Sequence, residues 1–175
     1  MQPNLVVGNK VDADAAVIAE VTVAAFRTPA IGNHTEQQFI VEALRAAKAL
    51  AVSRVAERDG KIVGHVAFSP VTISDNAPNW YGLGPVSVLP EYRRQGIGTA
   101  LIHEDLSRLN TPNAAGCRLV GHPAYYRRFG FANIAGLVLE GVQPEVFFAL
   151  PFIAPRSSGC VHCHEAFLAD GSQRA

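Results

Sequence analysis

The residues best suited to chemistry lie in one glycine-rich segment in the middle of the chain, between Val86 and Leu101. Here an apolar run is followed by Arg93 and Arg94, and then by Gly96 and Gly98 at the start of a helical pattern. The first backbone N–H groups of a helix have no partner inside the helix. Together with the helix dipole they attract anions, and glycines let a phosphate approach the backbone. The segment therefore predicts a phosphate site, most naturally for a pyrophosphate.

Other glycine-rich phosphate loops have patterns that this segment lacks. A P-loop requires Gly-Lys-Ser or Gly-Lys-Thr, and neither occurs in the chain. A dinucleotide-binding fingerprint requires a third glycine where this chain has Leu101. From the two glycines alone, a helix start without a ligand stays an equal alternative.

A second candidate is the C-terminal segment Cys160-Val161-His162-Cys163-His164. Cys-x-x-Cys-His is the attachment pattern of c-type haem, and Cys and His are also zinc ligands. The haem interpretation needs export, and the N-terminus does not resemble a signal peptide. We predict a strand here, in which alternation separates Cys160 from Cys163. Because the two thiols would diverge, we expect neither haem nor a metal.

Composition narrows the class of protein. The chain has 175 residues, and we expect one domain over residues 1–175. A 49% hydrophobic content excludes global disorder, and the equal numbers of acidic and basic residues argue against nucleic-acid or membrane partners. The segment from Glu91 to Arg128 nevertheless has six arginines against three acidic residues. Its local charge of +3 suits a compact polyanion.

The amino-acid composition also indicates the cellular compartment. The richest apolar stretch, residues 137–153, is interrupted by charged residues and prolines and is too short to span a bilayer. Three cysteines are too few, and odd in number, for a secreted disulfide scaffold. We therefore expect a cytoplasmic protein.

The elements that must position these residues follow from periodicity and from turn signals. The first half predicts a strand at 5–7, helices at about 12–26 and 35–47 joined by a loop, and strands at 50–58, 61–69 and 80–88. Asp59-Gly60 is a hairpin signal, while Gly82, Gly84 and Pro85 indicate a bulge in the strand that contains them. The second half predicts helices at 96–109 and 123–129 and strands at 117–121, 146–150 and 160–167. This order indicates an α+β domain with a mixed sheet.

The pattern Val-x-Pro-x-x-Arg-x-x-Gly-x-Gly-x-x-Leu, from Val88 to Leu101, resembles the acetyl-CoA signature of the GNAT family of N-acetyltransferases. The order of elements before it matches the family, and Tyr126-Arg127-Arg128-Phe129-Gly130-Phe131 resembles the family's Tyr-x-x-x-Gly-Phe segment. The last third resembles the subgroup of bacterial YhbS-like proteins. The resemblance implies a mostly antiparallel mixed sheet, splayed into a V-shaped cleft and flanked by helices.

The resemblance also implies a site and a reaction. The pantetheine arm of acetyl-CoA would pair with the backbone of Val86, Ser87 and Val88. Arg93 is carried over beside the pyrophosphate, which would rest on the amides of Arg94, Gln95, Gly96, Ile97, Gly98 and Thr99. An amine would attack the thioester directly, with no metal. An N–H near Val88 would stabilise the oxyanion and Tyr126 would protonate the thiolate. We expect Tyr125 to point elsewhere, because adjacent helix residues lie about 100° apart.

The base for the ammonium is not assigned, because residues 80–88 contain no carboxylate or histidine. Glu36, His34, His65, His122 or a chain of water molecules are the candidates.

The acceptor would be a small-molecule or peptide amine, and family members are often homodimers. A non-catalytic acyl-CoA-binding module on the same fold is the main alternative function. An ATP-binding protein is a weaker one.

Overall fold

A central sheet organises the chain, and it is seen in a computed structural model that describes residues 4–28, 32–33, 37–109, 113–154 and 156–169. Its strands lie in the order β1-β4-β5-β6-β7-β9, and β8 and β10 pair beside the far end of β5. The bounds are Leu5–Asn9 for β1, Val52–Arg58 for β4, Lys61–Ile73 for β5, Trp80–Val88 for β6, Gly116–Val120 for β7, Leu137–Val138 for β8, Phe147–Pro151 for β9 and Gly159–His162 for β10. Within the described residues, β6 with β7 and β8 with β10 pair in parallel, and the other pairs of this sheet are antiparallel.

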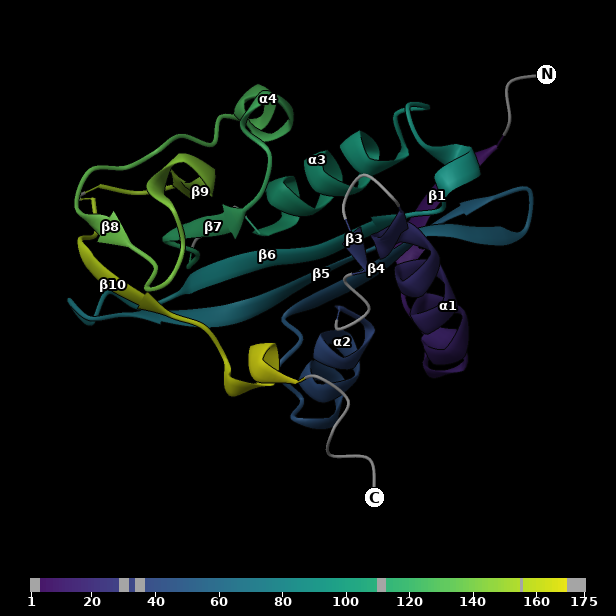
Figure 1. Cartoon of the computed structure of the whole chain (residues 1–175), viewed down its shortest axis with the longest axis horizontal. Helices are drawn as coiled ribbons and strands as arrows, with labels where there is room; N and C mark the ends of the chain where they lie inside the picture. Colours follow the sequence, from purple (N-terminus) through teal and green to yellow (C-terminus); the bar gives the residue numbers. More distant parts are fainter. Residues whose placement is uncertain (1–3, 29–31, 34–36, 110–112, 155, 170–175) are drawn as a thin grey trace.

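Helices cover both faces of this sheet (Figure 1). The helix α3, Ile97–Leu109, lies over one face, and α1, Ala15–Phe26, and α2, Gln37–Ala46, lie against the other. Buried residues of α3, β5, β6 and β7 form the main apolar core, which includes Phe68, Leu101 and Leu119. The expected fold class, a mixed sheet flanked by helices, is confirmed. Among the described helices, none is long and apolar enough to cross a bilayer.

The hairpin between β4 and β5 forms at the predicted turn. Asp59 and Gly60 both have positive φ values, of 50° and 81°, and they join Arg58 to Lys61. Two positive φ values in succession are required by the two-residue turn that matches the twist of a hairpin. The sequence signal and the backbone therefore agree.

The predicted bulge lies in β6, opposite β5. Val66 pairs with Val86, and Phe68 pairs with Leu83, so Gly84 and Pro85 lie opposite the single residue Ala67 and β6 has one extra residue. On its other edge, β6 pairs with β7 only from Trp80 to Gly82. Beyond Gly82 the strands part, which leaves that edge of β6 free of β7 from Leu83 to Val88.

Several parts of the structure differ from the sequence predictions. The segment expected as a loop after α1 contains two short paired strands, β2 (Arg27–Thr28) and β3 (Gly32–Asn33). The short strand β8 was not predicted. The helix expected at 123–129 is one α-helical turn, α4 (Pro123–Tyr126), followed by a 3₁₀ turn at Arg127–Phe129. The capping box expected at 35–38 begins outside the described residues.

The last strand is shorter than predicted. It ends at His162, and a 3₁₀ helix follows at Glu165–Leu168. The imidazole of His164 accepts a hydrogen bond from the backbone N–H of Ala166 at 3.1 Å and so caps this helix. A local cap competes with continued pairing to the sheet, and here it prevails.

Candidate functional site

A cavity of about 710 Å³ opens where α3 begins and β6 leaves β7. Its walls come from the end of α1, the second half of β6, the segment before α3 and the α4 turn. The lining residues are Ala25, Phe26, Val86, Val88, Tyr92, Arg93, Arg94, Gly96, Ile97, Gly98, Thr99, Tyr125, Tyr126 and Arg128. The segment that the sequence singled out for phosphate binding therefore borders a cavity large enough for a small-molecule ligand.

The loop before α3 has the backbone geometry of an anion site. Arg94 and Gly96 have positive φ values of 60° and 81°, which turn the chain sharply into the helix. The first helical bond runs from the N–H of Ala100 to the carbonyl of Gly96 at 2.9 Å. The amides of Ile97, Gly98 and Thr99 come before it, so they have no acceptor within the helix. They can donate to a phosphate in the cavity.

The structure brings eight of the ten predicted cofactor-binding residues to the cavity wall, and Ser87 and Gln95 do not line it. Ser87 lies between the lining residues Val86 and Val88 on a strand, so its side chain points to the opposite face. There it is buried and donates to the hydroxyl of Thr22 at 3.3 Å. Gln95 accepts from the guanidinium of Arg58 and donates to the carbonyl of Glu91 at 3.0 Å. For both residues the family role concerns the backbone, and that role stays a prediction.

Arg93 connects the loop to α1. Its guanidinium donates to the carbonyl of Ala25, in the last turn of that helix. The C-terminal end of a helix carries a partial negative charge, so a cation there is stabilising. This contact gives Arg93 a structural partner in addition to its place in the cavity wall.

Tyr126 lies in the cavity wall with its ring packed against Gly121. A Cβ on residue 121 would overlap the Tyr126 ring, so a glycine is needed for this close approach. Burial, and to a lesser degree the neighbouring Tyr125, raise the pKa of Tyr126 to about 12. The phenol is therefore protonated at neutral pH, which is the form that can donate a proton.

Tyr125 lines the same cavity, and the prediction that it points elsewhere is wrong. The two tyrosine rings meet edge to face at 5.0 Å between centroids, and both reach the cavity from the single turn of α4. A Cβ on Gly98 would lie 2.7 Å from the hydroxyl oxygen of Tyr125. The guanidinium of Arg128 lies 4.7 Å from the Tyr125 ring centroid. Sequence reasoning missed this pair, although its i, i+3 spacing was a usable signal.

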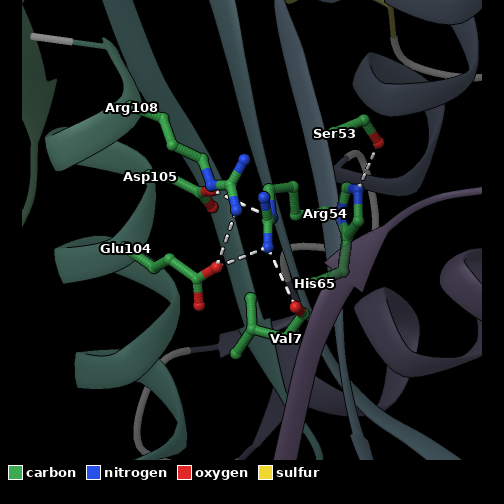
Figure 2. Close-up of polar contacts among 7 residues, drawn as sticks. All are labelled: Val7, Ser53, Arg54, His65, Glu104, Asp105 and Arg108. Carbon is green, nitrogen blue, oxygen red and sulfur yellow. Dashed lines mark hydrogen bonds and ion pairs between the residues drawn. The ribbon is translucent and has the colours of Figure 1, made fainter.

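None of the candidate bases that the structure describes lines the cavity. His34 and Glu36 lie outside the described residues. His65 is fully buried away from the cavity, and its imidazole Nε2 lies 2.9 Å from the Ser53 hydroxyl (Figure 2). Burial and the nearby charges of Arg45 and Lys10 lower the pKa of His65 to about 3, which makes it a poor base. His122 is exposed and accepts from the N–H of Ala124 at 3.3 Å, as the cap of α4. Among the described lining residues there is no carboxylate or imidazole.

A partly buried ionic cluster joins α3 to the sheet behind this site (Figure 2). Arg54 of β4 donates to Glu104 at 2.8 Å and to the carbonyl of Val7 at 2.9 Å, and its Nε lies 3.1 Å from Asp105. Arg108 lies 3.3 Å from the same Glu104 carboxylate. One arginine thus joins β1, β4 and α3, and the first turn of α3 carries the amides of the candidate phosphate site.

The cysteine and histidine segment near the C-terminus is occupied by structural contacts. The thiol of Cys163 accepts a hydrogen bond from Arg118 at 2.8 Å, and His164 caps the last 3₁₀ helix. Among the described residues, no group of three or more His, Cys, Asp or Glu side chains could hold a metal ion.

Comparisons with known proteins agree with this geometry. A sequence model described as an acetyltransferase (GNAT) domain matches residues 49–133. The uncharacterized N-acetyltransferase YhbS of Escherichia coli K12 is 40% identical over 93 residues, which are 53% of this chain and 56% of that protein. The chain thus matches little more than half the length of this curated relative.

Two crystal structures are similar over nearly their whole length. A GNAT family acetyltransferase from Brucella melitensis, in complex with acetyl-CoA, is 45% identical, with a TM-score of 0.82 over 94% of this chain and 98% of that one. YhbS from Escherichia coli, in complex with CoA, is 28% identical, with a TM-score of 0.87 over 98% of this chain and 96% of that one. The signature segment, the splayed strands and these similarities lead to one conclusion: the chain belongs to the GNAT family of N-acetyltransferases.

Proposed function

We propose that this protein transfers the acetyl group of acetyl-CoA to a primary amine of a small molecule or peptide, by direct attack on the thioester. One observation carries the proposal. A single cavity is bordered by the free amides at the start of α3, by the β6 edge that does not pair with β7, and by the phenol of Tyr126. The acetyl-CoA and CoA complexes of the two similar structures support this choice of co-substrate.

The proposed binding mode uses mostly the backbone. The pyrophosphate rests on the amides of residues 94–99, with the charge of the helix N-terminus behind it. The pantetheine arm pairs with β6 at residues 86–88, on the edge opposite to the one that pairs with β5. This places the thioester deeper in the cleft, toward Tyr126.

The reaction needs a hydrogen-bond donor for the oxyanion, a general acid for the leaving thiolate and a base for the amine. The amine nitrogen attacks the thioester carbonyl, and an N–H near Val88 donates to the oxyanion of the tetrahedral intermediate. When the intermediate collapses, the C–S bond breaks and Tyr126 gives its proton to the leaving thiolate. The tyrosinate is reprotonated by solvent, and the amide nitrogen loses its extra proton to a base. The high pKa of Tyr126 keeps it in the acid form that this step needs.

The base stays open between a chain of water molecules, Glu36, His34 and His122. Replacing Glu36 by Gln tests one of them. If Glu36 is the base, the variant lowers kcat and leaves the Kd for acetyl-CoA unchanged. An unchanged pH–rate profile removes Glu36 from the mechanism.

Turnover is the decisive experiment. Purified protein is incubated with acetyl-CoA and a panel of amines, and free thiol release is measured together with acetylated product by mass spectrometry. Thiol release that depends on one class of amine supports the transferase. If the protein binds CoA but turns over none of the amines, the result supports the alternative, a non-catalytic acyl-CoA-binding module. The described residues that line the cavity include no carboxylate, which favours that alternative. If ATP displaces CoA at a similar concentration, the result contradicts both the transferase and the acyl-CoA-binding module.

A homodimer and a cytoplasmic location stay predictions from the sequence.

A further inference from the structure

Four arginines flank the candidate CoA site, and the structure uses them differently. Arg93 lines the cavity, but its guanidinium donates to the carbonyl of Ala25. Arg127 is exposed and does not line the cavity. Arg94 and Arg128 line it, and they come from two separate elements, the loop before α3 and the 3₁₀ turn after α4. Arg94 belongs to the signature segment, whereas the family resemblance gives Arg128 no role.

The position of Arg128 is set by an aromatic support. Its guanidinium lies over the ring of Tyr125, 4.7 Å from the centroid. That ring is held by edge contacts to Tyr126 at 5.0 Å and to Phe129 at 5.5 Å. A guanidinium over an aromatic face keeps its charge and its in-plane N–H donors. Arg128 is therefore a positioned cation, although its side chain is exposed.

The same support reaches the start of α3. The hydroxyl oxygen of Tyr125 would lie 2.7 Å from a Cβ on Gly98, so the two residues are in close contact. Tyr125 thus has the cation of Arg128 on its ring and Gly98, whose amide has no acceptor within the helix, at its hydroxyl end. Both groups attract the same kind of ligand atom, an anionic oxygen.

We propose that Arg128, supported by the ring of Tyr125, binds a phosphate group of CoA beside the amides of α3. The inference rests on the proposed function and adds a second binding element to it. CoA carries a pyrophosphate and a 3′-phosphate, and a planar guanidinium can form paired hydrogen bonds to either. The helix N-terminus offers only a partial charge, equivalent to about half an elementary charge. A full cation from another element offsets more of the charge of the cofactor.

Calorimetry with truncated ligands tests the role of Arg128. The Kd values of CoA and 3′-dephospho-CoA are measured for the wild type, Arg128→Ala and the matched control Arg127→Ala. Pantetheine binding is followed by ligand-observed NMR at millimolar concentration. Loss of one charge-assisted contact predicts about tenfold weaker CoA binding by Arg128→Ala. Arg127→Ala and pantetheine binding are expected to change less than twofold. A loss confined to CoA assigns Arg128 to the 3′-phosphate, and a loss shared with 3′-dephospho-CoA assigns it to the pyrophosphate.

Variants of Tyr125 test the support. Tyr125→Leu removes the ring and is expected to weaken CoA binding as Arg128→Ala does, with the double variant no weaker than Arg128→Ala alone. Tyr125→Phe keeps the ring and is expected to bind like the wild type. Equal CoA affinity in Arg128→Ala and Arg127→Ala overturns the inference, as does an equal loss of pantetheine binding. A wild-type protein that binds no CoA overturns the proposed function itself.

Discussion

The Nε of Arg54 lies 3.1 Å from the carboxylate of Asp105, and both side chains are almost completely buried (Figure 2). Asp105 sits on α3 and Arg54 on β4, so this ion pair crosses the interface between helix and sheet. Neither carboxylate oxygen of Asp105 has a hydrogen bond of good geometry. Desolvation therefore outweighs the attraction of Arg54 and raises the pKa of Asp105 to about 6.

We predict that Asp105 makes the free energy of unfolding fall as the pH rises. Its pKa is about 6 in the folded protein and 3.8 for the free group, so the folded state binds the proton more tightly. Its contribution is complete below pH 3.8 and is lost as the pH rises through 6. The shift corresponds to about 3 kcal/mol. Asp105→Asn should remove this slope in urea unfolding measured from pH 4 to 8. An identical slope in the variant contradicts the assignment.

A second prediction concerns the other member of the pair. Arg54→Met leaves the carboxylate of Asp105 buried without its counter-ion, which costs roughly 3–5 kcal/mol of unfolding free energy at pH 7. Arg108→Ala is the matched control, because Arg108 is exposed and contacts the same Glu104 carboxylate. Its loss should cost less than about 0.5 kcal/mol. Urea unfolding measures the free energy of unfolding of both variants. Equal values for the two would show that the burial of Arg54 has no energetic role.

The sequence predicted most of the path of the chain around the site, because those parts depend on local signals. The turn at Asp59-Gly60, the bulge at Gly84-Pro85 and the glycine-rich start of α3 are each specified by residues next to one another. Arg54, in contrast, contacts Val7 and Glu104, which are 47 and 50 residues away from it in the sequence. No local sequence pattern indicates these contacts. The orientation of Tyr125 was missed for a different reason. Adjacent helical residues leave the backbone in different directions, but the long rings of Tyr125 and Tyr126 meet edge to face and both reach the same cavity.

We predict that His65 makes the protein sensitive to acid. Burial holds its pKa at about 3 in the folded state, below its ordinary value of 6.5, so the unfolded chain binds the proton more readily. The stability from neutral His65 is complete above pH 6.5 and is lost as the pH falls toward 3. This loss amounts to at most about 5 kcal/mol. His65→Gln keeps a polar partner for Ser53 and should lower the pH of half-unfolding, measured by circular dichroism. An unchanged midpoint would exclude His65 as the acid-sensitive group.

The contact between Tyr125 and Gly98 predicts that Gly98→Ala weakens CoA binding and that the loss depends on the Tyr125 hydroxyl. Gly98→Ala places a methyl group 2.7 Å from the Tyr125 hydroxyl oxygen, so the tyrosine must move and the cavity wall changes. We expect CoA affinity to fall by roughly tenfold, in line with the 1–3 kcal/mol of an overpacked site. Tyr125→Phe removes the clashing oxygen and should restore part of the affinity in the double variant. Gly8→Ala is the control, because nothing lies within 4 Å of a Cβ there. A defect that Tyr125→Phe does not relieve would place the clash elsewhere.

The assignment of Tyr126 as the general acid predicts a loss in rate without a loss in affinity. Tyr126→Phe keeps the ring against Gly121 and removes only the hydroxyl. Removal of a general acid lowers kcat by about 100-fold or more, while the Kd for acetyl-CoA should change less than twofold. Tyr81→Phe is the matched control, since Tyr81 packs against the same core and does not line the cavity. A leaving group that needs less protonation should lessen the defect, so a thioester of a more acidic thiol should narrow the gap between variant and wild type. A defect of equal size with both thioesters would show that the hydroxyl positions the substrate and does not donate the proton.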